Sequence, residues 1–150
     1  MSMRRSTPGQ VATTLHANCV DLEGRGVLIT GASGSGKSGL SLQLMALGAR
    51  LVADDRTELT ARDGALLASC PPAISGMIEA RGVGLLRADP VATSVVAIVV
   101  DLDTAEAERL PEPRRTVING VTLPILRKLA APHFPAAILQ YLRAGRIQTQ

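Results

Sequence analysis

Eight residues between a short apolar segment and a helical pattern determine the architecture of this chain: Gly31-Ala32-Ser33-Gly34-Ser35-Gly36-Lys37-Ser38. This run satisfies G-x-x-x-x-G-K-[ST], the pattern of a phosphate-binding P-loop. Its glycines allow the backbone to turn tightly, so that N–H groups face a phosphate chain. The helix that begins near Lys37 adds its positive N-terminal dipole to the same place. The run therefore predicts a nucleotide-binding loop.

The segments on either side of the loop have the periodicity that the motif needs. The apolar segment Val27–Thr30 predicts a buried strand, and the spacing of Leu40, Leu44 and Leu47 predicts a helix that ends at Gly48. In this context Lys37 can reach the β- and γ-phosphates, and the Ser38 hydroxyl can bind Mg²⁺. A Gly/Ser-rich loop that meets the pattern by chance would not be expected between a strand and a helix. ATP and Mg²⁺ are the expected ligands.

Strand patterns outnumber helical ones in the rest of the chain. Asp63-Gly64 and Asn119-Gly120 each lie between apolar alternations, which is typical of hairpins. Residues 95–102 form the strongest strand pattern, and a last helix is predicted from Pro132 to about Gly145. We therefore expect an α/β fold, a single P-loop nucleotide-binding domain with a mixed sheet, hairpins and few helices. It should occupy residues 16–150, after a flexible arm over residues 1–15.

Composition excludes several classes of function. The 150 residues are 46% hydrophobic and 19% charged, which fits one packed domain. Aromatic residues make up 1%, too few for stacking on single-stranded nucleic acid, and a net charge of +3 suits an anionic ligand better than DNA. The basic N-terminal residues are not followed by an apolar segment, so we expect no signal peptide, and no apolar run in the sequence is long enough to span a membrane. Cys19 and Cys70 show no metal spacing, so reduced thiols in a cytoplasmic protein are expected.

Two places offer carboxylates for a metal or a nucleophile. Asp54-Asp55 follows the strand pattern Leu51–Ala53, at the sheet edge where ligands bind in α/β folds. Adjacent carboxylates repel each other without a cation or partner, which favours a functional pair over a solvated turn. Asp101 follows the strand Val95–Val100 and is interpreted either as a Walker B aspartate or as a turn residue.

Two further features remain ambiguous on the residues alone. In Glu79-Ala80-Arg81-Gly82-Val83-Gly84 the acid and the arginine would point to one side of a strand, and the glycines indicate unusual dihedral angles. The alternative is a surface ion pair before a loop. His16 is isolated and, taken alone, is more typical of an ordinary surface or half-buried histidine.

Taken together and in this order, these residues resemble the catalytic domain of the bacterial HPr kinase/phosphorylase family. The similarity runs from about His16 to Leu110. It includes the P-loop, the segment Arg50–Asp55, the segment Ile78–Gly84 and the segment Glu108-Arg109-Leu110. A P-loop alone would indicate only a nucleotide-binding protein, whereas the combination is specific to this family.

The resemblance implies an ATP-dependent protein kinase that phosphorylates a serine of HPr, the phosphocarrier protein of the sugar phosphotransferase system. Asp54 would act as the base toward the serine hydroxyl, Lys37 would hold phosphate, and Arg109 would contact phosphate. His16, fifteen residues before Gly31, would assist as the family's catalytic-site histidine. Gly31–Ser38 would bind ATP, and Ser38, Glu79 and Asp55 would hold Mg²⁺. The family implies a homo-oligomer, a hexamer, with no nucleic-acid or membrane partner.

The sequence also departs from the family. We expect a catalytic domain without the family's N-terminal domain. The family's Pro-Gly-Arg-Asn segment, linked to phosphorolytic dephosphorylation, is not found; residues 123–128 keep only a proline and basic residues. Phosphorylase activity is therefore expected to be weak or absent. Two other hypotheses remain open, a P-loop kinase of small molecules and a non-catalytic regulatory module that binds nucleotide.

Overall fold

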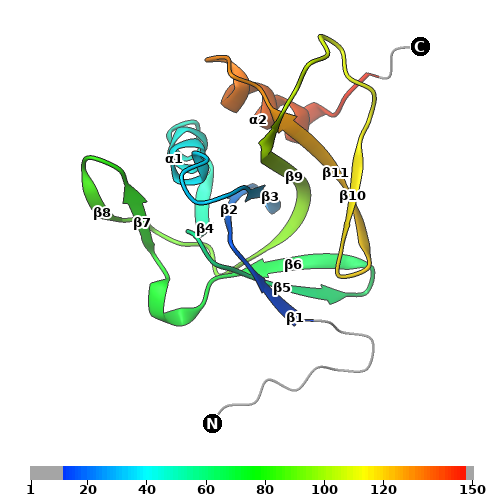
Figure 1. Ribbon diagram of the computed structural model, residues 1–150. Helices are drawn as coiled ribbons and strands as arrows, with labels where there is room; N and C mark the ends of the chain where they lie inside the picture. The colour runs from blue at the N-terminus through cyan, green and yellow to red at the C-terminus, as the bar shows by residue number, and fades with distance from the viewer. Residues whose placement is uncertain (1–11, 148–150) are drawn as a thin grey trace.

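The central strand of the fold is the one that leads into the P-loop. The structure, a computed structural model, describes residues 12–147. The segment Val27–Ile29 is fully buried in the middle of a sheet, between the longest strand on one side and a hairpin partner on the other. Figure 1 shows the resulting curled sheet with both α-helices on one side. The described elements are β1 (Ala12–Leu15), β2 (Ala17–Leu22), β3 (Arg25–Thr30), α1 (Lys37–Ala46), β4 (Arg50–Ala53), β5 (Thr57–Arg62), β6 (Ala65–Ser69), the 3₁₀ turn η1 (Pro72–Ile74), β7 (Met77–Ala80), β8 (Gly84–Arg87), β9 (Thr93–Ala105), β10 (Arg115–Ile118), β11 (Val121–Lys128) and α2 (Phe134–Ala144).

The order of strands in the main sheet brings the predicted site residues to one edge. Hydrogen bonding runs β1-β5-β6-β9-β3-β2-β4, and β11 also pairs with β9 and carries β10. β3 and β9 are parallel, whereas β2 is antiparallel to both β3 and β4. The loop after β3, the start of β2 and the end of β4 therefore lie at the same edge, and these are the segments that carry the P-loop, His16 and Asp54.

Two hydrophobic clusters cover the two faces of this sheet. One cluster joins α1, α2 and β7 to the central strands, with Leu44 and Ile138 fully buried. The other lies beneath β5, β6 and β11, around Leu28, Leu59 and Leu66. Both clusters consist almost entirely of aliphatic residues, which recur along the chain at the spacing of one helix face or one strand face. A chain with 1% aromatic residues can therefore still form two cores. The mixed α/β class with hairpins and few helices is confirmed.

Most local expectations agree with the structure. α1 ends as predicted, because Gly48 at φ +114 donates to Met45 O while Ala49 donates to Leu44 O. Asp63-Gly64 and Asn119-Gly120 all have positive φ, as two-residue hairpin turns of type I′ require. No helix in residues 12–147 is long and apolar enough to cross a bilayer.

The predicted N-terminal arm is wrong at its boundary. Residues 1–11 of that arm lie outside the described residues, but Ala12–Leu15 forms β1, an antiparallel partner of β5. The pattern from Val11 to Val20 is mixed and only compatible with a strand, so it did not locate the end of the arm. Pairing with β5, which is distant in sequence, supplies the hydrogen bonds instead. The ordered domain therefore begins before His16.

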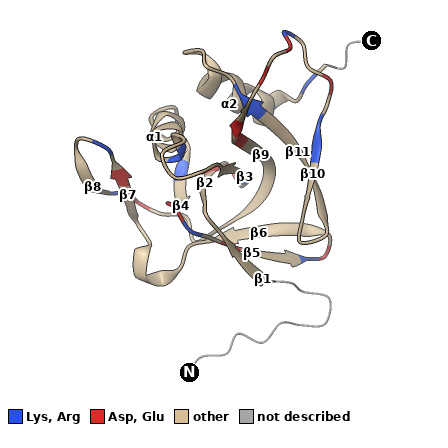
Figure 2. Cartoon of the chain, in the orientation of Figure 1, with Lys and Arg blue, Asp and Glu red and all other residues tan. Residues whose placement is uncertain are grey.

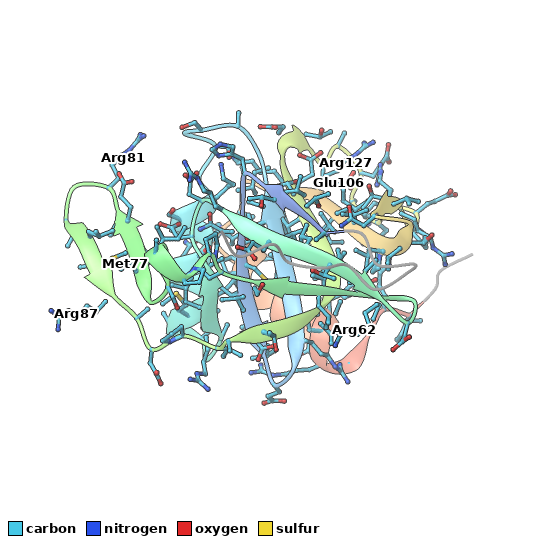
Figure 3. All side chains as sticks on the ribbon, turned by 90° about the horizontal axis from the view of Figure 1, so that it is seen from below. Arg62, Met77, Arg81, Arg87, Glu106 and Arg127 are labelled. Atoms are coloured by element: carbon cyan, nitrogen blue, oxygen red, sulfur yellow. The ribbon has the colours of Figure 1, made fainter. Side chains whose placement is uncertain are left out.

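The pair β7 and β8 forms a separate small sheet that projects from the body. Figure 3 shows Arg81 and Arg87 on its outer side. Arg81 follows β7 at a turn, and no ion pair joins it to Glu79 among the described residues. The alternative interpretation of this segment as a surface ion pair is therefore not supported.

Candidate active site

The loop between β3 and α1 has the geometry of a phosphate site. Lys37 is 7% exposed, and its Nζ donates to the carbonyl oxygens of Gly31 at 2.8 Å and Ala32 at 3.2 Å. The ammonium group therefore lies against the loop. α1 has no side-chain cap and no acidic residue in its first turn, so its first N–H groups can bind an anion.

Two further residues, Ser35 and Gly31, shape the loop for a phosphate chain. The buried Ser35 Oγ has no hydrogen-bond partner within the described residues. A buried hydroxyl without a partner costs free energy, and a phosphate oxygen would provide one. Gly31 is required at its position, since a Cβ there would lie 2.5 Å from Ser35 Oγ and 3.2 Å from the Cβ of Leu102.

The carboxylate that contacts the loop from β9 is Asp103. The backbone N–H of Ala32 donates to both of its oxygens, at 2.9 and 3.1 Å. Asp101, the predicted candidate for a Walker B aspartate, instead accepts the N–H of Asp103 at 2.8 Å. β9 continues past Asp101 to Ala105, so the aspartate at the loop is two residues later than the sequence pattern indicated.

Asp54 connects three segments of the site. Its Oδ1 accepts the hydroxyl of Ser38 at 2.6 Å and the side-chain amide of Asn18 at 2.7 Å. Its Oδ2 accepts the backbone N–H of Glu79 at 2.9 Å. The end of β4, the P-loop serine and β7 are thereby joined through one half-buried carboxylate.

Asn18, like Asp103, is a site residue that sequence reasoning missed. It is fully buried in β2, where its Nδ2 also donates to Ser41 Oγ at 3.0 Å and its Oδ1 accepts the N–H of Asp55 at 2.8 Å. An amide that both donates and accepts can hold a carboxylate and a backbone N–H together. The available signal was a polar amide between apolar neighbours of a strand that is buried throughout.

The two adjacent aspartates point in different directions. Asp55 adopts φ +68, in the left-handed region that aspartate tolerates better than most residues. Its carboxylate lies 3.3 Å from His16 Nδ1, and the two side chains are 60% and 75% exposed. Asp54 faces the P-loop while Asp55 faces His16, an arrangement that provides each carboxylate with its own partners. Figure 2 marks where acidic and basic residues lie along the chain.

The other predicted site residues are not gathered with these. Glu79 is exposed and contacts Asp54 through its backbone N–H. Arg109 is exposed on the segment after β9, and within residues 12–147 no hydrogen bond or ion pair joins it to the site. No cluster of three or more His, Cys, Asp or Glu side chains forms a metal site in this part of the chain. Magnesium commonly takes one or two protein carboxylates together with phosphate oxygens and water, so Ser38, Asp55 and Glu79 remain predicted ligands.

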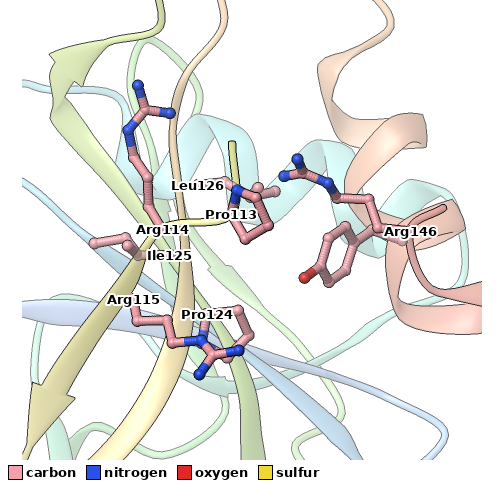
Figure 4. A pocket seen from close by; sticks show the side chains of 8 residues that line it. Pro113, Arg114, Arg115, Pro124, Ile125, Leu126 and Arg146 are labelled. Carbon is pink, nitrogen blue, oxygen red and sulfur yellow. The ribbon is translucent and has the colours of Figure 1, made fainter. Parts of the chain in front are cut away.

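A second basic feature lies apart from the P-loop. Arg114, Arg115 and Arg146 line a cavity of about 180 Å³ between the β10–β11 hairpin and the segment after α2 (Figure 4). Arg114 already pairs with Glu106 at 2.9 Å. The backbone N–H of Glu108, followed by the Arg114 charge, holds the pKa of the Glu106 carboxyl below its usual range. Arg114 therefore already has a local ion-pair partner in Glu106.

We predict that Asn18→Ala lowers both stability and phosphoryl transfer. The substitution removes the hydrogen bonds that the fully buried Asn18 side chain makes with Ser41, Asp54 and the Asp55 N–H, and each such bond typically contributes about 0.5–1.5 kcal/mol. Asp54 loses the donor that orients it, so transfer should fall as well. Thr57→Val is the matched control, because Thr57 Oγ1 donates to Ala17 O at 2.8 Å in the same buried region but does not contact Asp54. Thermal unfolding and single-turnover assays should separate the two: both variants lose stability, and only Asn18→Ala loses transfer.

Glu79→Gln tests the metal prediction. If the Glu79 carboxylate contributes to Mg²⁺ binding, the variant should need more Mg²⁺ for half-maximal transfer, since a neutral amide is a weaker ligand for a hard cation. The fold should be unaffected, because it is the backbone of Glu79 that bonds to Asp54. A magnesium titration that superimposes on the wild type would exclude the side chain as a ligand. Glu58→Gln, at a carboxylate on the hairpin strand β5, provides the charge-matched control.

Comparisons with known proteins show which family the chain resembles. The family model described as the HPr Serine kinase C-terminal domain matches residues 10–110. The HPr kinase/phosphorylase of Clostridium tetani is 49% identical over 74 residues, covering 49% of this chain and 24% of that protein. The HPr kinase/phosphorylase of Limosilactobacillus reuteri is 36% identical over 124 residues, covering 74% of this chain and 39% of that protein.

The same architecture occurs in a solved structure. The Hpr(Ser) kinase/phosphatase from Coxiella burnetii matches with a TM-score of 0.73 and 28% identity, covering 87% of this chain and 88% of that chain. The chain spans about a quarter to two fifths of the length of the curated relatives. The matched region includes the P-loop, Asp54 and the β7 segment described above. The chain belongs to the HPr serine kinase C-terminal domain family.

Proposed function

We propose that this protein is an ATP-dependent protein kinase that phosphorylates a serine of an HPr-type phosphocarrier protein. The observation that carries the proposal is the bond between Ser38 Oγ and Asp54 Oδ1 at 2.6 Å. It connects the P-loop, where a phosphoryl donor would bind, to a carboxylate that can take a proton from an acceptor hydroxyl. The names of the family and of its relatives indicate the acceptor, HPr.

In this proposal the residues of the chain mainly position charge. The P-loop N–H groups and Lys37 bind the phosphate oxygens. The hydroxyl oxygen of the acceptor serine forms a bond to the γ-phosphorus while the bond between that phosphorus and the ADP oxygen breaks, and Asp54 accepts the proton of the hydroxyl. Asn18 and the N–H of Glu79 keep the Asp54 carboxylate in place. His16 is a positioning residue for Asp55, and Arg109 is proposed to contact phosphate after a movement of its exposed segment.

Bound Mg²⁺ would neutralise charge on the phosphate oxygens. Ser38, Asp55 and Glu79 are the residues proposed to hold it. Ser38 bonds directly to Asp54, so a cation at the serine hydroxyl would also be near that carboxylate. Hydroxyl and carboxylate oxygens are hard donors, which fit magnesium.

The proposed setting is the cytoplasm, where ATP is available and thiols stay reduced. Cys19 and Cys70 are both free, and burial raises the pKa of each thiol, most strongly at fully buried Cys19. A homo-oligomer, a hexamer by family resemblance, is proposed for the assembly, without nucleic acid or membrane as a partner.

The experiment that tests the function combines the protein with labelled ATP, Mg²⁺ and HPr-type carrier proteins. We expect label on a carrier as phosphoserine, and none on a carrier whose target serine is replaced by alanine. The reverse direction is measured with phosphorylated carrier and inorganic phosphate, and should be slow. Label on a small metabolite would instead support a metabolite kinase. Nucleotide binding without transfer to any acceptor would support a regulatory module.

A further inference from the structure

A cavity of about 180 Å³ lies between the β10–β11 hairpin and the end of α2, apart from the candidate active site (Figure 4). Its lining residues fall between Pro113 and Arg146, beyond the residues 10–110 that the family model matches. Neither the P-loop nor Asp54 contributes to its walls. A ligand in this cavity would therefore be recognised by a part of the chain that the phosphate site does not use.

Two elements that pack on the core form the walls. On one side β11 provides Pro124, Ile125 and Leu126, all of them half-buried. Ile125 and Leu126 pair with the parallel strand β9 and pack against the two hydrophobic clusters of the sheet. On the other side Tyr141 of α2 packs against the cluster that includes the buried residues of its own helix. The core of the domain thus fixes the distance between the two walls.

Three arginines surround these walls, and two of them have no acidic partner. Arg114 pairs with Glu106 at 2.9 Å, and the two side chains are 27% and 10% exposed. Within residues 12–147 no carboxylate forms an ion pair with Arg115 or Arg146. Arg146 donates instead to the carbonyl oxygen of Pro111. Three arginines and one paired carboxylate leave two positive charges at the cavity without a partner.

The two unpaired guanidinium groups lie apart from each other. Figure 4 shows the Arg115 side chain reaching the cavity from the hairpin and the Arg146 side chain reaching it from the segment after α2, while Arg114 points away. The β11 wall of the cavity is apolar. This arrangement suits a molecule that has a negative group at each end and an apolar middle.

We propose that this cavity binds a short dicarboxylate, with one carboxylate at Arg115 and the other at Arg146. A guanidinium group can pair with a carboxylate through two parallel N–H bonds. Two carboxylates balance the two unpaired arginines, whereas two phosphate groups, at about −1.5 to −2 charges each, would exceed them. A single anionic group would reach only one of the two guanidinium groups. The Tyr141 hydroxyl adds a further donor on the wall of the cavity.

The volume of the cavity sets the length of the ligand. A cavity of about 150 Å³ holds a benzene molecule, so about 180 Å³ holds roughly eight heavy atoms, the size of a four-carbon dicarboxylate such as succinate. The methylene groups of such a ligand would lie against the apolar β11 wall. Apolar surface with a few polar groups at defined places is typical of small-molecule sites. The inference does not depend on the proposed kinase function.

The test titrates the protein with succinate by calorimetry. Succinate should bind, and propionate, which has one carboxylate, should bind ~10-fold or more weakly because it loses one charge-assisted pair. The titration is repeated with Mg²⁺ and a non-hydrolysable ATP analogue bound. Succinate affinity should then be unchanged, and inorganic phosphate should bind more weakly than succinate. Competition between succinate and the analogue would assign the anion to the P-loop and overturn the proposal, whereas failure of the analogue to bind would count against the kinase function alone.

Variants assign the binding to the cavity. Arg115→Gln and Arg146→Gln should each weaken succinate binding by ~10-fold or more. Arg143→Gln removes the same charge from α2 outside the cavity and should bind succinate like the wild type. Tyr141→Phe keeps the ring and should weaken succinate by ~3- to 10-fold through the lost hydroxyl bond. Thermal unfolding checks the fold of each variant, and exposed Arg115 and Arg146 should be dispensable for it.

Four results would each overturn the proposal. They are no succinate binding by the wild type, equal affinity for succinate and propionate, tighter binding of phosphate than of succinate with the analogue present, and wild-type succinate affinity in both Arg115→Gln and Arg146→Gln.

Discussion

Asp54→Asn should lose most phosphoryl transfer and still bind ATP. The asparagine can accept the hydrogen bond from Ser38 but cannot take the proton of the serine hydroxyl. Positioned acid–base groups contribute roughly 10²- to 10⁴-fold to rate, and a loss in that range is expected. Nucleotide affinity should be near that of the wild type, or higher if the carboxylate repels the γ-phosphate. Single-turnover transfer and equilibrium nucleotide binding, measured on the same sample, check both parts.

Asp55→Asn is the matched comparison, because it makes the same chemical change at the adjacent residue. Asp55 faces His16, not Ser38, at 3.3 Å. We expect weaker Mg²⁺ binding, a higher Mg²⁺ requirement and partial recovery of transfer at high Mg²⁺. Normal transfer in Asp54→Asn together with an Asp55→Asn variant that is inactive at every Mg²⁺ concentration would show that the roles of the two residues are reversed.

The parts of this fold that the sequence predicted are those determined by neighbours along the chain. In each of these motifs the local residues themselves determine the backbone conformation. The glycines of the P-loop allow a backbone that faces phosphate, and the pairs Asp63-Gly64 and Asn119-Gly120 adopt the positive φ angles of a tight turn. The position of Asp54 at the sheet edge was also predicted, since a carboxylate pair at a strand end is unusual locally. These predictions required no knowledge of which strands pair.

The parts that were missed depend on pairing between distant segments. Asn18 reaches Asp54 only because β2 lies between β3 and β4, an order that periodicity does not reveal. Asp103 reaches Ala32 because β9 runs parallel to β3 and extends beyond it. β1 is a strand because β5 lies beside it. Local sequence patterns do not predict which distant strands pair, so they could not predict the contacts of these residues.

Lys37→Ala should weaken ATP binding and abolish measurable transfer. The Lys37 ammonium is the positive side chain of the P-loop, and 7% exposure means that its interactions are little screened by water. Removing a preorganised group that stabilises developing charge typically costs about 10²- to 10³-fold in rate. The fold should persist, because the Gly31 and Ala32 carbonyls that Lys37 contacts lie in a partly exposed loop where water can replace it.

Lys37→Arg should fail for a different reason, which makes it the more informative variant. It keeps the charge, but a planar guanidinium cannot replace a compact ammonium between two carbonyl oxygens at 2.8 and 3.2 Å. Arg62→Ala, which removes one positive charge from an exposed hairpin, is the control for net charge and should transfer normally. Nucleotide titration and single-turnover transfer measure all three. ATP affinity equal to the wild type in both Lys37 variants would mean that phosphate does not bind beside this ammonium, and the P-loop assignment would then be wrong.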